Sequence, residues 1–368
     1  MYDYLIIGGG VIGAFMSYSL SQYNVSVALL EKEHNAALHA TTHNSALIHS
    51  PVSVGPQYGV LKSTLAQRGN QLYDTLAPAL GVPVLANGAL MLAKNDEEIA
   101  KLVALQKEAQ DRQLEGVRLI TGEEIWQLEP NLHPNIKAVL TMPTAKTAST
   151  RILVDRLLEE ATHQGSDIVF GQEVSSIEVQ DTHFVLTTRQ GETYHARTLL
   201  NTAGTFAAKV AGLLEEEVPY EMTPVRGEYR VLSKDAQGFV KHTLFPLPSA
   251  KGKGILVIPQ PDGTVRLGPT ATPQESLDAA PITPEGLAQI NDNVDDILVN
   301  VPYQHEIRTY AGIRATTTHK DFYIQPSAKH PRFIHIAGID SPGVTAAPAI
   351  AEYVIETWLK PLDPITLK

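Results

Sequence analysis

Three glycines and one acidic residue near the start of the chain form the clearest chemical pattern in the sequence. Gly8, Gly10 and Gly13 have the spacing G-x-G-x-x-G. In this pattern the first glycine permits a tight turn, the second lets the backbone approach a pyrophosphate, and the third lets a helix pack closely on a strand. Glu31 can accept hydrogen bonds from a ribose 2′-OH and would repel a 2′-phosphate. These residues predict a site for a dinucleotide without a 2′-phosphate.

The elements expected around these residues are the ones that such a site requires. Residues 4–7 are predicted to form a buried strand, residues 11–22 a helix, and residues 25–30 a second strand that ends at Glu31. N–H groups of the first helical turn, at Val11 and Ile12, would face the phosphates together with the positive end of the helix dipole. The alternative is a glycine-rich turn in another kind of α/β protein, which would not require this order of elements.

Composition narrows the class of protein. The 368-residue chain contains no cysteine, which excludes disulfides, zinc–thiolate sites, iron–sulfur clusters and cysteine nucleophiles. This is compatible with the cytoplasmic location that we expect, and we expect no metal centre. No apolar run reaches the ~18 residues of a membrane span. The net charge of -11 argues against a nucleic-acid partner, so any anion site must be built from a few local cations.

The order of predicted elements indicates a discontinuous α/β fold. We expect a Rossmann-like nucleotide-binding domain from residues 1–80, 146–215 and 313–368. An inserted α+β substrate domain, built on a mainly antiparallel sheet, would comprise residues 81–145 and 216–312, with a strand pair within residues 84–92. Only one βαβ unit is continuous. Rossmann domains for nicotinamide cofactors are usually contiguous, so this pattern favours a flavin.

Further stretches resemble a known family. The turn Thr202-Ala203-Gly204 and the loop 338–345, together with the opening motif, resemble the D-amino-acid-oxidase-type FAD superfamily. Four more stretches resemble the FAD-dependent glycerol-3-phosphate dehydrogenases and oxidases of the short oxidase type. They are Asn44-Ser45-Ala46-Leu47-Ile48-His49, Arg226-Gly227-Glu228-Tyr229, residues 252–257 leading to 268–271, and residues 341–348. L-2-hydroxyglutarate oxidases share much of this pattern.

The resemblance implies FAD as the cofactor and suggests which residues contact it. Val174 would offer backbone groups to the adenine, although it could also be an ordinary strand valine. A helix that starts at residues 343–345 would direct its N–H groups at the flavin's pyrimidine end, where negative charge develops on reduction. The full set of expected contacts is Gly8, Gly10, Val11, Ile12, Gly13, Glu31, Thr42, Asn44, Ser45, Val174, Ala203, Gly204, Gly338, Ser341, Gly343, Val344 and Thr345.

The resemblance also implies a reaction, the oxidation of sn-glycerol 3-phosphate to dihydroxyacetone phosphate with hydride transfer to flavin N5. His49 is the candidate base, since a free histidine with a pKa of ~6.5 can accept a proton at neutral pH. Its alternative role is structural. Arg314 matches the family's substrate-side arginine and could hold an anionic phosphorylated alcohol. Lys253, between two glycines, could reach the same anion or could be a solvated surface lysine, and Ser341 could donate one more hydrogen bond.

Three functional readings remain open. The first is an oxidase in which O2 reoxidises the flavin and gives H2O2. The second is an FAD enzyme for a 2-hydroxy acid such as L-2-hydroxyglutarate, or for an amino acid, in which Arg314 would hold a carboxylate. The third is a flavin-binding subunit without turnover, because residues 50–56 after His49 depart from the family, which usually has a Gly soon after the His and then a Pro-Gly. The sequence leaves the oligomeric state open.

Overall fold

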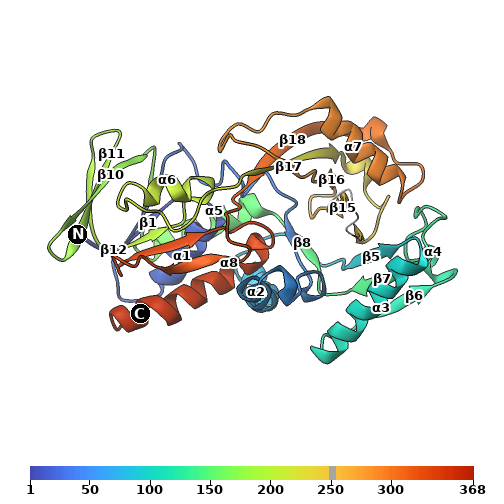
Figure 1. Ribbon diagram of the computed structural model, residues 1–368, viewed down its shortest axis with the longest axis horizontal. Helices are drawn as coiled ribbons and strands as arrows, with labels where there is room; N and C mark the ends of the chain where they lie inside the picture. The colour runs from blue at the N-terminus through green and yellow to red at the C-terminus, as the bar shows by residue number, and fades with distance from the viewer. Residues whose placement is uncertain (248–253) are drawn as a thin grey trace.

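The computed structural model describes residues 1–247 and 254–368, and it consists of two halves side by side along the long axis of the molecule (Figure 1). The first half is built on a sheet with a parallel core. The order of its parallel strands is β9 (Asp167–Phe170), β2 (Val27–Glu31), β1 (Tyr2–Ile7), β12 (Thr193–Asn201) and β20 (Phe333–Ala337). The hairpin β10 (Val174–Gln180) and β11 (His183–Thr188) joins β12, and β19 (Tyr323–Pro326) joins β20, both antiparallel. The predicted Rossmann-like α/β fold is therefore confirmed.

Strand β1 is buried on both faces, as its apolar sequence predicts for a central parallel strand. Tyr4 and Ile6 pack on one side with α1 (Val11–Ser21), α5 (Thr150–His163) and α8 (Gly343–Val354). Leu5 and Ile7 pack on the other side, where α6 (Ala207–Ala211) lies. The last helix starts at Gly343 and continues through a π-helical turn, η6 (Ile355–Leu359), into α9 (Lys360–Leu362).

Among the described residues, the second half is built on a sheet of nine strands, which pair antiparallel except where β14 meets β5. Its strands come from two stretches of chain: β5 (Ala89–Ala93), β6 (Leu119–Thr121) and β7 (Ala138–Met142), and then β13 (Val225–Leu232), β14 (Thr243–Pro246), β15 (Leu256–Pro259), β16 (Val265–Gly268), β17 (Thr272–Pro273) and β18 (Glu306–Arg314). The mainly antiparallel second sheet matches the expectation, while the five residue ranges proposed for the domains stay a prediction.

Helices cover both faces of this second sheet. One face carries α4 (Glu124–Leu128) and α7 (Pro284–Asp295), and the other carries α3 (Asp96–Asp111). The described residues also form short 3₁₀ turns in both halves: η1 (Pro51–Ser53), η2 (Pro56–Tyr58), η3 (Gly204–Phe206), η4 (Lys234–Ala236) and η5 (Tyr303–His305). Within the described part of the chain, no helix has an apolar stretch long enough to cross a lipid bilayer.

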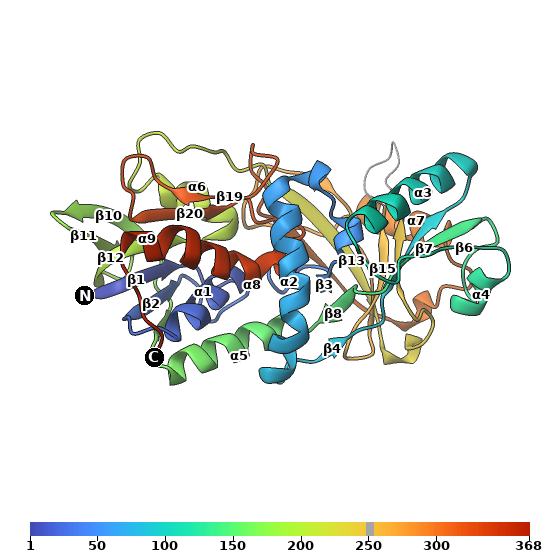
Figure 2. The same ribbon diagram turned by 90° about the horizontal axis from the view of Figure 1, so that it is seen from below.

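A long helix and a small sheet join the two halves. Helix α2 (Val60–Ala79) lies across the junction (Figure 2), beside β3 (Leu47–Ile48), β8 (Lys146–Ala148) and β4 (Val84–Leu85). The predicted strand pair within residues 84–92 is wrong, because β4 pairs with β8 whereas β5 pairs with β7 and β14. Gly88, at φ +68°, lies between β4 and β5 where the chain passes from one sheet to the next.

Candidate active site

Two positions where β1 leads into α1 require glycine: Gly8 in the turn and Gly13 in the helix. Gly8 has a φ of +110°, and a Cβ there would lie 2.8 Å from the carbonyl oxygen of Thr202. A Cβ at Gly13 would lie 2.0 Å from the carbonyl oxygen of Gly8. Position 13 therefore lets α1 pack directly on the end of β1, as the motif requires.

A pocket that is partly open to solvent lies beside this turn, with about 880 Å³ of atom-free space in and above it. Four elements meet there: the β1–α1 turn, the end of β2, the start of β10 and the end of β12. Six of the residues expected to contact the cofactor line the pocket: Gly8, Gly10, Glu31, Val174, Ala203 and Gly204.

Glu31 places a fixed carboxylate at this pocket. The side chain is 7% exposed; Oε2 accepts a hydrogen bond of 2.6 Å from the N–H of Gly9, and Oε1 accepts one of 2.9 Å from the N–H of Glu33. Each carboxylate oxygen can accept a second hydrogen bond, so ribose hydroxyls can still bind there. The negative charge disfavours a 2′-phosphate at the same place.

Helix α1 starts without the side chain that usually caps a helix. Gly10 is its N-cap and makes no side-chain hydrogen bond, and the first turn, which contains Val11 and Ile12, has no acidic residue. The N–H of Val11 donates to Oγ1 of Thr41, 3.0 Å away, and Thr41 also lines the pocket. A helix N-terminus that faces a pocket and has no acidic residue in its first turn suits a phosphate, so the residues present fit a dinucleotide. Thr41 was missed because a single hydroxyl in an irregular stretch gives no pattern.

Thr42, Asn44 and Ser45 hold a loop rather than line this pocket. The Thr42 hydroxyl donates to the carbonyl of Ala37, and the Asn44 amide bonds backbone groups of residues 40, 41 and 46. The carbonyl of Asn44 accepts hydrogen bonds of 2.7 Å from both Arg266 and Tyr310 of the second sheet, and that of Ser45 accepts from Gln260. Any contact of these three residues with a cofactor stays a prediction.

His49 and Ser341 meet at the junction of the two halves, although 292 positions separate them in the sequence. Nε2 of His49 lies 3.2 Å from Oγ of Ser341. The backbone of His49 is held on both sides, since its N–H donates to Oγ1 of Thr345 and its carbonyl accepts from Asn70 of α2, both at 2.9 Å. The ring of Phe245 meets the imidazole edge to face at 5.9 Å. Two candidates that the sequence proposes separately thus lie in direct contact.

The loop before α8 repeats the arrangement at α1. Gly338, at φ +68°, follows β20, and α8 starts after Pro342 with no side-chain cap and no acidic residue in its first turn. Gly343, Val344 and Thr345 form that turn. The Val344 carbonyl accepts a 2.7 Å hydrogen bond from Tyr73 of α2. The N-termini of α1 and α8 thus both lack a cap from their own N-cap residue and an acidic first turn, and their positive dipole ends can stabilise negative charge.

Helix α2 supports this loop by two contacts that sequence reasoning missed. Lys62 Nζ lies 2.5 Å from Oδ1 of Asp340, and the two side chains are only 9% and 13% exposed. Asp321 in turn accepts hydrogen bonds of 2.8 Å from the N–H groups of Leu61 and Lys62. Where α2 crosses α8, a Cβ on Gly69 would lie 2.0 Å from the carbonyl oxygen of Thr345. In the sequence Lys62 resembles a surface lysine, so no sequence pattern predicts that it is buried.

Arg314 ends β18 on the sheet face that also carries Gly227. Its Nη2 donates a 2.9 Å hydrogen bond to the carbonyl of Thr270, which orients the guanidinium while leaving other N–H groups for an anion. Arg226 pairs with Ile313, so it lies on the opposite face, 3.6 Å from the buried carboxylate of Glu228. Lys253 lies outside the described residues.

Comparison with known proteins gives the same assignment for the whole chain. Residues 3–357 match the family model described as FAD dependent oxidoreductase. The chain is 35% identical to a glycerol 3-phosphate dehydrogenase of Caloramator mitchellensis over 356 residues, which cover 97% of this chain and 73% of that protein. It is 30% identical to a glycerol 3-phosphate oxidase of Mycoplasma pneumoniae over 362 residues, covering 96% of this chain and 93% of that protein.

A solved structure shows the same similarity in three dimensions. The dithionite-reduced L-alpha-glycerophosphate oxidase from Mycoplasma pneumoniae with FAD bound superposes with a TM-score of 0.92 at 28% identity. The superposition covers 100% of this chain and 96% of that one. Both halves and the junction between them are therefore shared with that protein.

Proposed function

The chain belongs to the family of FAD-dependent oxidoreductases, and from this premise we propose that it oxidises sn-glycerol 3-phosphate to dihydroxyacetone phosphate. The observation that carries the proposal is the similarity, along nearly the whole chain, to proteins named for glycerol 3-phosphate. The contact between His49 and Ser341 adds local support, because it brings a proton acceptor and a hydrogen-bond donor together at the junction.

The cofactor would be held by the N-termini of α1 and α8. Glu31 would bind the ribose, and the first turn of α1 would bind the pyrophosphate. The first turn of α8 would lie at the flavin end. Bound FAD supplies the electron acceptor of the reaction, because its N5 accepts the hydride from the carbinol carbon. The protein has to bind the substrate, orient its hydroxyl and accept the hydroxyl proton.

His49 is the proposed proton acceptor and Ser341 orients the alcohol beside it. Hydrogen bonds to Thr345 and Asn70 fix the backbone of His49, and its ring lies against Phe245 and Ser341. A positioned base of this kind contributes roughly 10²–10⁴-fold to a rate. We assign the phosphate to Arg314, whose planar guanidinium can bind two oxygens at once, and to Lys253.

O2 is the proposed electron acceptor, giving H2O2. Air-saturated protein with sn-glycerol 3-phosphate should then release one H2O2 per substrate oxidised. Rapid reduction of a dye acceptor without peroxide would identify a dehydrogenase instead.

Anaerobic flavin bleaching tests the substrate directly. We expect the absorbance of bound FAD to be lost rapidly with sn-glycerol 3-phosphate and slowly with L-2-hydroxyglutarate or glycine at the same concentration. Replacing Lys253 with Ala should weaken binding of the phosphate strongly and of a carboxylate little. Faster bleaching by the hydroxy acid would support the alternative substrate, and no bleaching by any of the three would contradict the oxidation itself.

A further inference from the structure

Ser53 ends the 3₁₀ turn η1 that follows His49. We propose that Ser53 fixes the tautomer of His49, so that Nδ1 carries the proton of the neutral ring and Nε2 carries the lone pair. This inference rests on the proposed function, because it assigns Nε2 as the atom that accepts the substrate's hydroxyl proton. Ser53 is then a positioning residue that acts through His49.

The tautomer follows from the number of hydrogens that a serine can donate. Oγ of Ser53 lies 2.9 Å from the carbonyl oxygen of Ser50 and 3.3 Å from Nδ1 of His49. A carbonyl oxygen can only accept, so the shorter contact uses the single O–H of Ser53. Towards His49, the same oxygen can then act only as an acceptor. A hydrogen bond between them therefore requires a proton on Nδ1.

The surrounding bonds hold Ser53 in this orientation. The N–H of Ser53 also donates to the carbonyl of Ser50, at 3.0 Å, so the backbone and the hydroxyl of one residue converge on one oxygen. The hydroxyl of Ser50 accepts a 3.0 Å hydrogen bond from Thr144, next to β8. On the side of α2, Ser63 donates a 2.8 Å hydrogen bond to the carbonyl of Val54. The turn is thus tied to both elements that cross the junction.

A fixed tautomer determines where a proton can be accepted. In a neutral imidazole one nitrogen donates and the other accepts, and the bond made by one nitrogen sets the state of the other. With Nδ1–H directed at Ser53, the lone pair on Nε2 points towards Ser341. In the reaction, the hydroxyl proton moves to Nε2 and the hydride moves to oxidised FAD, which leaves the ketone and an imidazolium. Nδ1–H keeps its bond to Ser53 throughout.

The first test measures the tautomer without substrate. FAD-loaded protein labelled with ¹⁵N at histidine should show, for neutral His49, a protonated Nδ1 and an unprotonated Nε2 in its nitrogen chemical shifts, with the signal assigned by its loss in His49→Asn. A neutral His49 that carries its proton on Nε2 would overturn the inference. This measurement needs no change at Ser53, so it stands even if a Ser53 variant does not fold.

The second test measures the rate of anaerobic flavin reduction by sn-glycerol 3-phosphate. We expect Ser53→Ala to lower the limiting rate by about 10-fold or more with little change in substrate affinity, and Ser53→Thr to restore it. Ser63→Ala is the matched control, because it removes a hydrogen bond to the same segment without touching His49. A Ser53→Ala protein with the wild-type rate, or an equal loss in Ser63→Ala, would contradict the role of Ser53. Failure of wild-type flavin to be reduced would instead contradict the proposed function, while the nitrogen shifts would still test the tautomer.

Discussion

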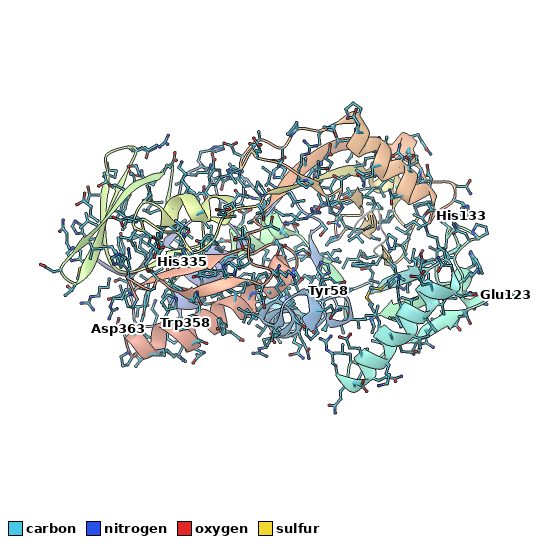
Figure 3. All side chains as sticks on the ribbon, in the orientation of Figure 1. Tyr58, Glu123, His133, His335, Trp358 and Asp363 are labelled. Atoms are coloured by element: carbon cyan, nitrogen blue, oxygen red, sulfur yellow. The ribbon has the colours of Figure 1, made fainter. Side chains whose placement is uncertain are left out.

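His49 and His335 both have two ring nitrogens within 3.3 Å of polar side chains, but their surroundings differ in kind. His49 is half-buried at the junction, where its ring nitrogens meet hydroxyl groups of Ser53 and Ser341. His335 is 0% exposed on β20, inside the first half, and lies well apart from Tyr58 at the junction (Figure 3). Its Nε2 lies 3.2 Å from the carboxylate of Glu215, and Nδ1 lies 3.2 Å from the hydroxyl of Tyr220.

The difference shows how location separates the histidine proposed as the base from a structural one. His335 is enclosed by the rings of Phe333, Tyr220 and Tyr323, so no substrate can reach it. Burial lowers the pKa of His335 below its usual value, and the nearby Glu215 opposes this effect. His49 has backbone supports from distant segments and a ring that faces the junction. With 13 histidines in the chain, only such surroundings can distinguish the two roles.

Replacing His49 with Asn should have the largest effect. We expect the rate of flavin reduction by sn-glycerol 3-phosphate to fall by about 10²–10⁴-fold, because the proton acceptor is lost, while FAD remains bound. Stopped-flow absorbance under anaerobic conditions measures the rate. His335→Gln should leave this rate within about 3-fold of wild type once folded, since His335 cannot touch substrate. Equal losses of rate in both variants would remove the distinction between the two histidines.

The stability of the protein should depend on the buried Lys62–Asp340 pair much more than on an exposed ion pair of the same helix. Lys62→Met leaves Asp340 nearly buried without its partner, which we expect to cost about 3 kcal/mol. Arg68→Met is the control, because Arg68 and Glu352 also link α2 to α8 but are largely exposed, and it should cost less than about 1 kcal/mol. Thermal unfolding of the FAD-loaded proteins measures both. Similar losses of Tm would show that burial of the Lys62 pair is unimportant.

Arg314→Lys should change affinity more than rate. Lysine keeps the charge but lacks the planar pair of N–H groups that can bind two phosphate oxygens while a third bonds the Thr270 carbonyl, so we expect KM for sn-glycerol 3-phosphate to rise about 10-fold. The limiting rate of flavin reduction should change by less than about 3-fold. An unchanged KM would place the phosphate elsewhere.

The smallest effect is the pH dependence of stability that comes from His335. Because burial lowers its folded-state pKa below the usual 6.5, the unfolded chain binds more protons between the two values, and stability is lost as the pH falls below 6.5. In His335→Gln the slope of stability against pH in this range should be flatter, by at most about 1.4 kcal/mol per pH unit. His183→Gln, at the exposed hairpin, is the control. A slope that His335→Gln leaves unchanged would mean that another group titrates.

The dinucleotide turn could be predicted from the sequence because it is local. The motif, its helix and Glu31 lie within one βαβ unit, and their spacing alone specifies the tight turn and the close packing at Gly13. The antiparallel second sheet could also be predicted, because Gly and Pro separate its short strands.

Contacts across the junction could not be predicted from spacing. His49 and Ser341 were proposed only through resemblance to relatives, and nothing in the sequence pairs Lys62 with Asp340 or Phe245 with His49. The incorrect strand pair within residues 84–92 has the same origin. An apolar stretch shows that strands form, but their partners are set by segments that lie far away in the chain.

The crossing of α2 and α8 at Gly69 limits which residue position 69 can carry. Thr345 lies in the first turn of α8, where its hydroxyl oxygen accepts a hydrogen bond from the N–H of His49. Its carbonyl oxygen is so close to Gly69 that even one methyl group there would have no room. A side chain at position 69 would push the two helices apart and carry the imidazole with them. Surface positions along α2 can change with little effect, whereas this one sets the distance between the histidine and its supporting helix without taking part in the chemistry.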